Sequence, residues 1–128
     1  MISLKTAIPG PNSLAIINRR KNAMPAGLAK STEVAIAHAE GGVVTDVDGN
    51  VLLDFAGGIG MMNIGHSNKQ VVDAMKAQLD KYIHICSLVA TPEPYVELAE
   101  LLNALTPGDF PKKTLLANSG SEAVENAV

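Results

Sequence analysis

Three short, largely apolar runs lie between residues 34 and 55, and the first of them alternates along the chain as strands do. They cover residues 34–39, 43–47 and 51–55, with Gly41-Gly42 and Asp48-Gly49 between them. Asp-Gly between apolar runs is a strong hairpin signal, because both central residues of the tight turn take positive φ. The pattern predicts a three-stranded antiparallel meander.

Apolar residues spaced three and four positions apart predict helices on both sides of the meander. Before it, the break at Pro9-Gly10-Pro11 and a cap at Asn12 or Ser13 indicate a short helix to about Lys21, with Leu14 and Ile17 on one face. After it, Ser67-Asn68-Lys69-Gln70 has the reciprocal pattern of a capping box and opens a second helix. The apolar stripe of that helix consists of Val71, Val72, Met75 and Leu79.

The remaining residues predict a helix, a strand and a final helix. The first helix begins near Thr91-Pro92 and ends at 106–108, and its buried side is expected to carry Leu98, Leu101, Leu102 and Leu105. The apolar run 114–117 predicts a strand buried on both faces, which requires parallel neighbours joined by crossovers. It leads directly into a helix over 119–128 that has no C-cap glycine after it. We therefore expect an α/β protein whose chain breaks off within a helix.

Composition and charge narrow the possible functions. The 128 residues are 47% hydrophobic and support one modest core, while a net charge of −3 excludes a basic nucleic-acid binder. Two tyrosines, two phenylalanines and no tryptophan argue against a platform for stacked bases. The single cysteine, Cys86, excludes an intrachain disulfide and fits a reducing cytoplasm.

Neither secretion nor membrane insertion is expected. The first ten residues contain no basic leader followed by a long apolar stretch. The apolar segment 51–64 contains Asp54, Asn63 and three glycines, and it is too short to span a bilayer.

Three familiar site motifs are incomplete in this chain. Asp46-Val-Asp48-Gly-Asn50 resembles the start of a calcium loop, but the later positions that need glycine and glutamate hold other residues. Gly58-Ile-Gly60 lacks the third glycine of a dinucleotide fingerprint. His84 and Cys86 are two potential ligands, which do not complete a zinc site. We therefore predict no metal site, and a hairpin turn explains the aspartates.

The turn Asn118-Ser119-Gly120-Ser121 has two competing interpretations. A strand that runs directly into a helix N-terminus presents backbone N–H groups without partners, and these favour an anion such as phosphate. Gly120 would let a phosphate oxygen approach the backbone, with hydroxyls from Ser119 and Ser121 on either side. Ser119 and Glu122 also fit a capping box that needs no ligand. From these residues alone, simple capping is the stronger interpretation.

Motifs elsewhere in the chain favour phosphate binding over simple capping at this turn. The stretches 94–100 and 107–128, together with Leu53-Asp-Phe-Ala-Gly-Gly-Ile59 and Asn63-Ile-Gly-His66, resemble class III pyridoxal-phosphate-dependent transaminases in the same order. The resemblance covers roughly residues 30–128, about the first third of such an enzyme, and is closest to bacterial members that act on 4-aminobutyrate. It implies the start of a fold-type-I enzyme, with a small α+β segment over 1–66 and the beginning of the large, mainly parallel-sheet domain over 67–128.

The resemblance also implies roles for particular residues. Ser119, Gly120 and Ser121 would bind the phosphate of pyridoxal 5'-phosphate, and Ile59 would contact the carbon chain of the substrate. The complete enzyme would be a homodimer that passes an amino group from 4-aminobutyrate or a related ω-amino acid to 2-oxoglutarate.

The catalytic groups of that family lie downstream of the matched region. No lysine of this chain matches the Schiff-base lysine, so no catalytic residue is assigned and the isolated chain is expected to be inactive. The alternative is a non-catalytic remnant or interaction module whose helix 119–128 is capped and binds nothing.

Overall fold

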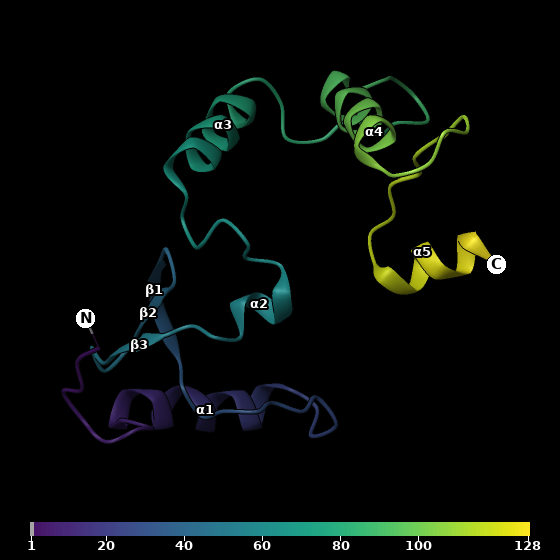
Figure 1. Cartoon of the computed structure of the whole chain (residues 1–128). Helices are drawn as coiled ribbons and strands as arrows, with labels where there is room; N and C mark the ends of the chain where they lie inside the picture. Colours follow the sequence, from purple (N-terminus) through teal and green to yellow (C-terminus); the bar gives the residue numbers. More distant parts are fainter. Residues whose placement is uncertain (1) are drawn as a thin grey trace. The chain divides into compact units, whose positions relative to one another are not determined.

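The computed structural model describes residues 2–128 and contains five helices and three strands among them (Figure 1). The helices are α1 (Pro11–Ala23), α2 (Gly57–Gly60), α3 (Lys69–Leu79), α4 (Glu93–Leu105) and α5 (Gly120–Ala127). The strands are β1 (Ile36–Glu40), β2 (Val43–Asp46) and β3 (Val51–Leu53). The chain divides into two compact units, one up to Ala77 and the other Gln78–Val128.

The predicted meander is confirmed. β2 lies between β1 and β3, and both pairs are antiparallel. Glu40 pairs with Val43 across the first turn, and a bulge interrupts the β1–β2 ladder between Ile36 and His38. Backbone bonds between Ser3 and Val51 extend the pairing along β3.

The second hairpin turn differs from the predicted two-residue form. Of the residues between Asp46 and Asn50, only Gly49 has positive φ, at 81°. The N–H of Gly49 bonds the Asp46 carbonyl, and the N–H of Asp46 bonds the Asn50 carbonyl, which describes a three-residue loop ending in a left-handed glycine. Asp48 therefore keeps negative φ, and its carboxylate is directed to another segment of the chain.

Two buried polar side chains organise this turn. Asp46 is 2% exposed, and one of its carboxylate oxygens accepts the N–H groups of Asp48 and Asn50. Asn50 is fully buried and its amide donates to the other Asp46 oxygen at 2.7 Å. The Asn50 carbonyl oxygen accepts the N–H groups of Lys5 and Thr6, which attaches the N-terminal segment to the sheet. The aspartates that resemble a calcium motif are thus occupied by protein donors.

Helix α1 begins at a distant carboxylate instead of at its own side chain. The predicted caps Asn12 and Ser13 are wrong in this respect: the N-cap is Gly10, and the Asp48 carboxylate accepts the N–H groups of both residues at 2.8 and 2.9 Å. Burial by itself would raise the pKa of Asp48, but these two N–H donors lower it below its ordinary value of 3.8. A methyl group on Gly10 would lie 2.3 Å from the Asp48 carboxyl carbon, so only glycine permits this approach.

The start of α3 also differs from the prediction. Ser67 is not the cap, because it has positive φ and its hydroxyl donates to the Ala39 carbonyl. Asn68 takes the capping role, and its side-chain oxygen accepts the N–H groups of Gln70 and Val71. The predicted Ser67–Gln70 capping box therefore places the cap one residue too early, because the Ser67 hydroxyl bonds to β1 instead of to its own helix.

The segment 114–117, predicted to be a strand, forms no ladder with another strand within residues 2–128. Its residues alternate in burial, with Thr114 and Leu116 turned inward. The Thr114 hydroxyl bonds Asn103 at 2.8 Å, and the N–H of Leu116 bonds the Tyr95 hydroxyl at 3.3 Å. The segment therefore lies along one face of α4 and ends shortly before α5 begins. Leu115, on the opposite side of the segment, is 66% exposed.

Helix α4 turns a different face inward from the one predicted. Tyr95, Ala99, Leu102 and Asn103 are partly covered, whereas Leu98, Leu101 and Leu105 are exposed. Only Leu102 of the four predicted leucines is therefore on the covered side. No helix among the described residues has the length and apolar character required to cross a membrane.

The buried turn generates a stability prediction. Asn50→Ala should lower the free energy of unfolding by about 3 kcal/mol, because it leaves the Lys5 and Thr6 amides and an Asp46 oxygen without their partner. Asn18→Ala, at an exposed position of α1, is the matched control and should change stability by less than about 0.5 kcal/mol. Urea unfolding of the two variants measures the difference, and equal midpoints would contradict it.

Candidate functional site

The N-terminus of α5 carries the three residues predicted to bind phosphate. Ser119 is the N-cap, with extended backbone, and its hydroxyl oxygen accepts the N–H of Glu122 at 3.2 Å. One Glu122 carboxylate oxygen accepts the N–H groups of Asn118 at 2.7 Å and Ser119 at 3.1 Å. The predicted capping box is therefore confirmed, and it is complete without a ligand.

The capping box leaves a second set of donors uncommitted. Among the described residues, the N–H groups of Gly120 and Ser121 and the hydroxyl of Ser121 have no hydrogen-bond partner. A methyl group built on Gly120 would meet nothing within 4 Å, so the backbone there is open to an approaching group. Two N–H groups at a helix N-terminus beside a hydroxyl are the donors that an oxyanion requires. The negative charge of the Glu122 carboxylate disfavours a nearby anion, although this carboxylate binds the N–H groups of Asn118 and the cap residue Ser119, not those of Gly120 and Ser121.

Ile59, the predicted substrate contact, lies in an unusual turn of the first unit. The backbone of α2 is left-handed, with φ of 48° at Gly57, 61° at Gly58, 59° at Ile59 and 82° at Gly60. Glycine adopts this conformation readily, but for a β-branched residue it costs about 1–2 kcal/mol. The Ile59 side chain is 97% exposed, so no packing contact compensates for this strain within the described residues.

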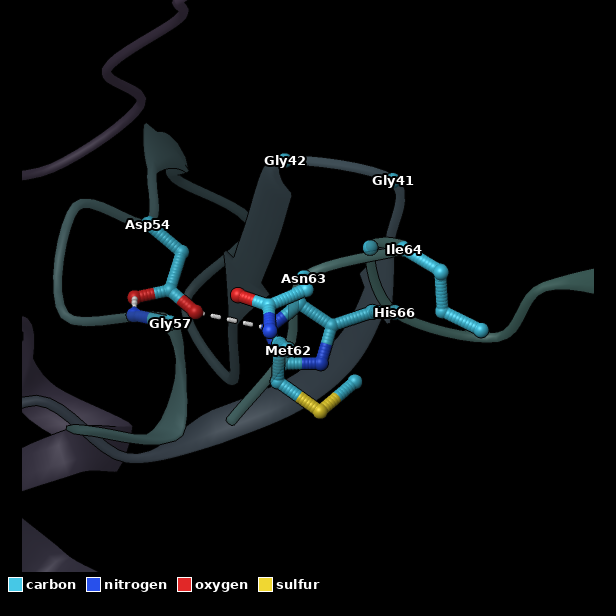
Figure 2. A pocket seen from close by; sticks show the side chains of 9 residues that line it. Gly41, Gly42, Asp54, Gly57, Met62, Asn63, Ile64 and His66 are labelled. Carbon is cyan, nitrogen blue, oxygen red and sulfur yellow. Dashed lines mark hydrogen bonds and ion pairs between the residues drawn. The ribbon is translucent and has the colours of Figure 1, made fainter. Parts of the chain in front are cut away.

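A hydrogen-bonded pair that sequence analysis missed lies next to this turn. The Nε2 atom of His66 is 2.6 Å from one carboxylate oxygen of Asp54 (Figure 2). The other oxygen accepts the N–H groups of Ala56 and Gly57 at 3.0 Å. The His66 hydrogen bond, followed by that from Gly57, holds the pKa of Asp54 below its ordinary value of 3.8. An aspartate that directly follows a strand and precedes glycines is a typical turn-forming pattern, and this was the available signal.

The pair borders a hollow of about 360 Å³ that is formed entirely within the first unit. Figure 2 shows Asp54 and His66 facing each other beside the side chains of Met62 and Asn63. The lining residues are Gly41, Gly42, Asp54, Gly57, Met62, Asn63, Ile64, Gly65 and His66. The hollow thus combines a hydrogen-bonded Asp–His pair with apolar groups and glycine backbone.

The structure brings some of the predicted residues together. Ser119, Gly120 and Ser121 are adjacent on one helix end in the second unit, and Ile59 belongs to the first. Among residues 2–128, no cluster of three His, Cys, Asp or Glu side chains has the geometry to hold a metal ion.

Comparisons with known proteins give a consistent result. Residues 26–128 match the family model described as aminotransferase class-III. The chain is 49% identical to the 4-aminobutyrate aminotransferase of Mycobacterium tuberculosis over 125 residues, which are 98% of this chain and 28% of that protein. It is 49% identical to the 5-aminovalerate aminotransferase of Pseudomonas aeruginosa over 114 residues, 89% of this chain and 27% of that protein. The chain therefore spans about a quarter of the length of these relatives.

A solved structure supports the same relationship. An aminotransferase from Vibrio fluvialis, in a form bound to PMP, aligns with a TM-score of 0.75 and 28% identity. The alignment covers 85% of this chain and 25% of that one. This likeness confirms the predicted fold class.

The two serines of the α5 turn should behave differently when substituted. Ser119→Ala removes the N-cap acceptor and should destabilise α5 by about 1 kcal/mol, seen as faster amide exchange in the helix. Ser121→Ala is the matched control, because its hydroxyl makes no bond to the described residues and the helix should keep its exchange rates. Equal effects of the two substitutions would show that the capping box is not what holds the helix end.

The Asp54 contacts predict a pH dependence. A lowered carboxyl pKa favours the ionised form in the folded state, so this stabilisation is present above pH 3.8 and is lost as the pH falls through the lower folded-state value. Carbon NMR of the Asp54 carboxyl should therefore show titration below 3.8 in the folded chain.

The variant His66→Leu provides the comparison for this titration. It removes the largest cause of the shift, so the pKa of Asp54 should move upward. An Asp54 that titrates at or above 3.8 in the unsubstituted chain would contradict the pairing.

Proposed function

The chain belongs to the class III aminotransferases, a family of enzymes, and from that premise we propose that it forms the N-terminal part of a pyridoxal-phosphate-dependent transaminase. In this proposal the complete enzyme transfers the amino group of 4-aminobutyrate, or of a related ω-amino acid, to 2-oxoglutarate. The names of the two relatives support the donor class, since one is a 4-aminobutyrate and the other a 5-aminovalerate aminotransferase.

The family and the PMP-bound neighbour indicate pyridoxal phosphate as the cofactor. When bound, this group supplies the carbonyl that receives the amino group and the ring that withdraws electrons. The residues at the α5 N-terminus fit its anionic end, because Gly120 and Ser121 have N–H groups without partners and the backbone beside Gly120 is open. We infer that these two residues, with the Ser119 hydroxyl as a further donor, hold the phosphate.

The uncommitted N–H groups are the observation that carries this assignment. Glu122 binds the N–H groups of Asn118 and Ser119, and this leaves those of Gly120 and Ser121 for an incoming anion. Capping and phosphate binding therefore use different donors and are compatible in one turn. In this proposal the helix dipole adds to the attraction for the phosphate.

Ile59 is proposed as an apolar contact for the carbon chain of the amino donor. Its side chain is exposed on a backbone conformation that carries strain, and strained residues cluster at functional sites. Burial of this side chain against a substrate methylene chain would recover part of the hydrophobic free energy that exposure to water forfeits.

Further features of the complete enzyme are part of the same proposal. We infer a homodimer in the cytoplasm, in which residues 1–66 form a small N-terminal segment and residues 67–128 begin the large cofactor-binding domain. The isolated chain is expected to be inactive, because none of its lysines matches the Schiff-base lysine of the family.

The rival proposal is a non-catalytic interaction module. It is favoured by one observation, namely that the Ser119–Glu122 capping box is complete without any ligand. Cofactor binding by a chimeric enzyme separates the two proposals.

A chimera tests the phosphate assignment. This chain replaces the matched segment of the M. tuberculosis relative, and cofactor affinity is measured by titration of the apoenzyme. Ser121→Ala should weaken the affinity roughly 10- to 100-fold, the range for a hydrogen bond to a charged group. Gly120→Ala should also weaken the affinity, because the added methyl group would occupy the open space beside the backbone where we propose that the phosphate lies. The methyl group meets no atom of the chain itself, so the fold should not change.

The matched control is Ser31→Ala, since Ser31 is exposed and lies outside the proposed cradle. It should leave the affinity unchanged. A chimera that keeps full cofactor affinity with both Gly120→Ala and Ser121→Ala would overturn the assignment, and one that never binds the cofactor would favour the interaction module.

A further inference from the structure

His66 is fixed in place through its backbone. Its N–H and carbonyl both bond to Gly41, at 2.8 and 2.9 Å, which ties it to the turn between β1 and β2. The neighbouring Gly65 has a φ of 78°, and a methyl group there would lie 2.9 Å from the Cα of Gly41. The backbone of His66, and with it the imidazole, is therefore attached to the sheet through a close contact that requires glycine at position 65.

The imidazole of His66 fixes the position of the Asp54 side chain through a hydrogen bond. The Asp54 backbone N–H bonds the Gly42 carbonyl at 3.0 Å, and its carboxylate receives His66 on one oxygen. The other oxygen holds the N–H groups of Ala56 and Gly57. The side chains of Asp54 and His66 are 14% and 22% exposed, so water competes weakly for these bonds.

Ala56 and Gly57, whose N–H groups bond to Asp54, also accept the hydrogen bonds of the left-handed turn. The carbonyl of Ala56 accepts the N–H groups of Ile59 at 2.7 Å and Gly60 at 3.2 Å. The carbonyl of Gly57 accepts those of the next two residues, Met61 and Met62, at 3.0 and 2.9 Å. Every hydrogen bond described within this turn therefore ends on a residue whose own N–H is bound to Asp54.

The direction of the Ile59 side chain is set by this backbone. A side chain that is 97% exposed makes almost no packing contact that could orient it within the first unit. We propose that Asp54 and His66 are a positioning pair, which fixes the direction of Ile59 and thereby selects the length of the amino donor's carbon chain. This inference rests on the proposed substrate contact of Ile59, but its structural part can be tested separately.

The structural part is tested by amide exchange in the 128-residue chain. His66→Leu removes the imidazole N–H and should accelerate exchange at Ala56, Gly57 and Ile59 roughly five- to tenfold, the factor for one hydrogen bond of ordinary net strength. Val44 and Thr45, in the central strand, should keep their rates. His66→Gln keeps a side-chain N–H that can reach Asp54 and should restore the slow exchange.

The matched control is His38→Leu, because His38 is an exposed histidine on β1. It should leave exchange in the turn unchanged. Unchanged exchange in the turn of His66→Leu would overturn the inference, and so would equal acceleration in the turn and the central strand of both His66→Leu and His66→Gln.

A measurement on the unsubstituted chain covers the case in which His66→Leu does not fold. A strong intraresidue NOE between the amide and Hα protons of Ile59 identifies positive φ, and nitrogen NMR should find a proton on Nε2 of His66. Negative φ at Ile59, or a His66 ring with no proton on Nε2, would overturn the inference.

The selection of donor length is tested in the chimera by a double-variant cycle. The measured quantity is the ratio of kcat/KM for 4-aminobutyrate to that for 5-aminovalerate. Ile59→Ala and His66→Leu should each shift this ratio several-fold without changing cofactor affinity, and the double variant should shift it no further than Ile59→Ala alone. Additive shifts would overturn the link between the two residues.

The two proposals fail in different ways. If Ile59→Ala leaves the ratio unchanged, the substrate contact of Ile59 is wrong, and with it the selection of donor length. The exchange experiment then still decides whether Asp54 and His66 hold the turn.

Discussion

Carboxylates that each accept two backbone N–H groups hold this chain together at its turns. Asp46 closes the second hairpin, Asp48 caps α1 from a distance, and Asp54 begins the left-handed turn. Glu122 does the same at the start of α5. A backbone N–H that lies in a turn has no ladder or helix partner, and an ionised acceptor satisfies it with a stronger bond than a neutral one. The positions of these four carboxylates therefore decide which N–H groups are occupied and which are left.

N–H groups that a carboxylate occupies serve the fold, and we propose that those left without a partner bind a ligand. In the first unit each N–H from Val47 to Asn50 bonds either an Asp46 carboxylate oxygen or a backbone carbonyl, so the aspartates that resemble a calcium motif serve the fold. At α5 the carboxylate binds the two N–H groups before the helix, and the next two, of Gly120 and Ser121, stay without partners among the described residues. Ile59 is a second such position, because its strained backbone is not compensated by packing of its exposed side chain, and we propose that it too contacts a ligand.

Local patterns predicted much of this structure, and long-range contacts account for the errors. The meander, the helix near 91–105 and the Ser119–Glu122 capping box follow from periodicity and from residues close in sequence. The caps of α1 and α3 were wrong because Asp48 lies 36 residues from Asn12 and because Ser67 bonds the distant Ala39. The segment 114–117 has strand-like composition, but a ladder needs a neighbouring strand, and the described chain places α4 there. The pairing of Asp54 with His66 depends on chain closure over 12 residues, which periodicity does not reveal.

The most direct test of the central claim is a crystal structure of the chimera with its cofactor bound. We predict that the N–H groups of Gly120 and Ser121 donate to phosphate oxygens at about 2.7–3.2 Å, while Glu122 keeps its bonds to Asn118 and Ser119. A phosphate bound elsewhere, with the Gly120 and Ser121 N–H groups facing water or protein acceptors, would contradict it.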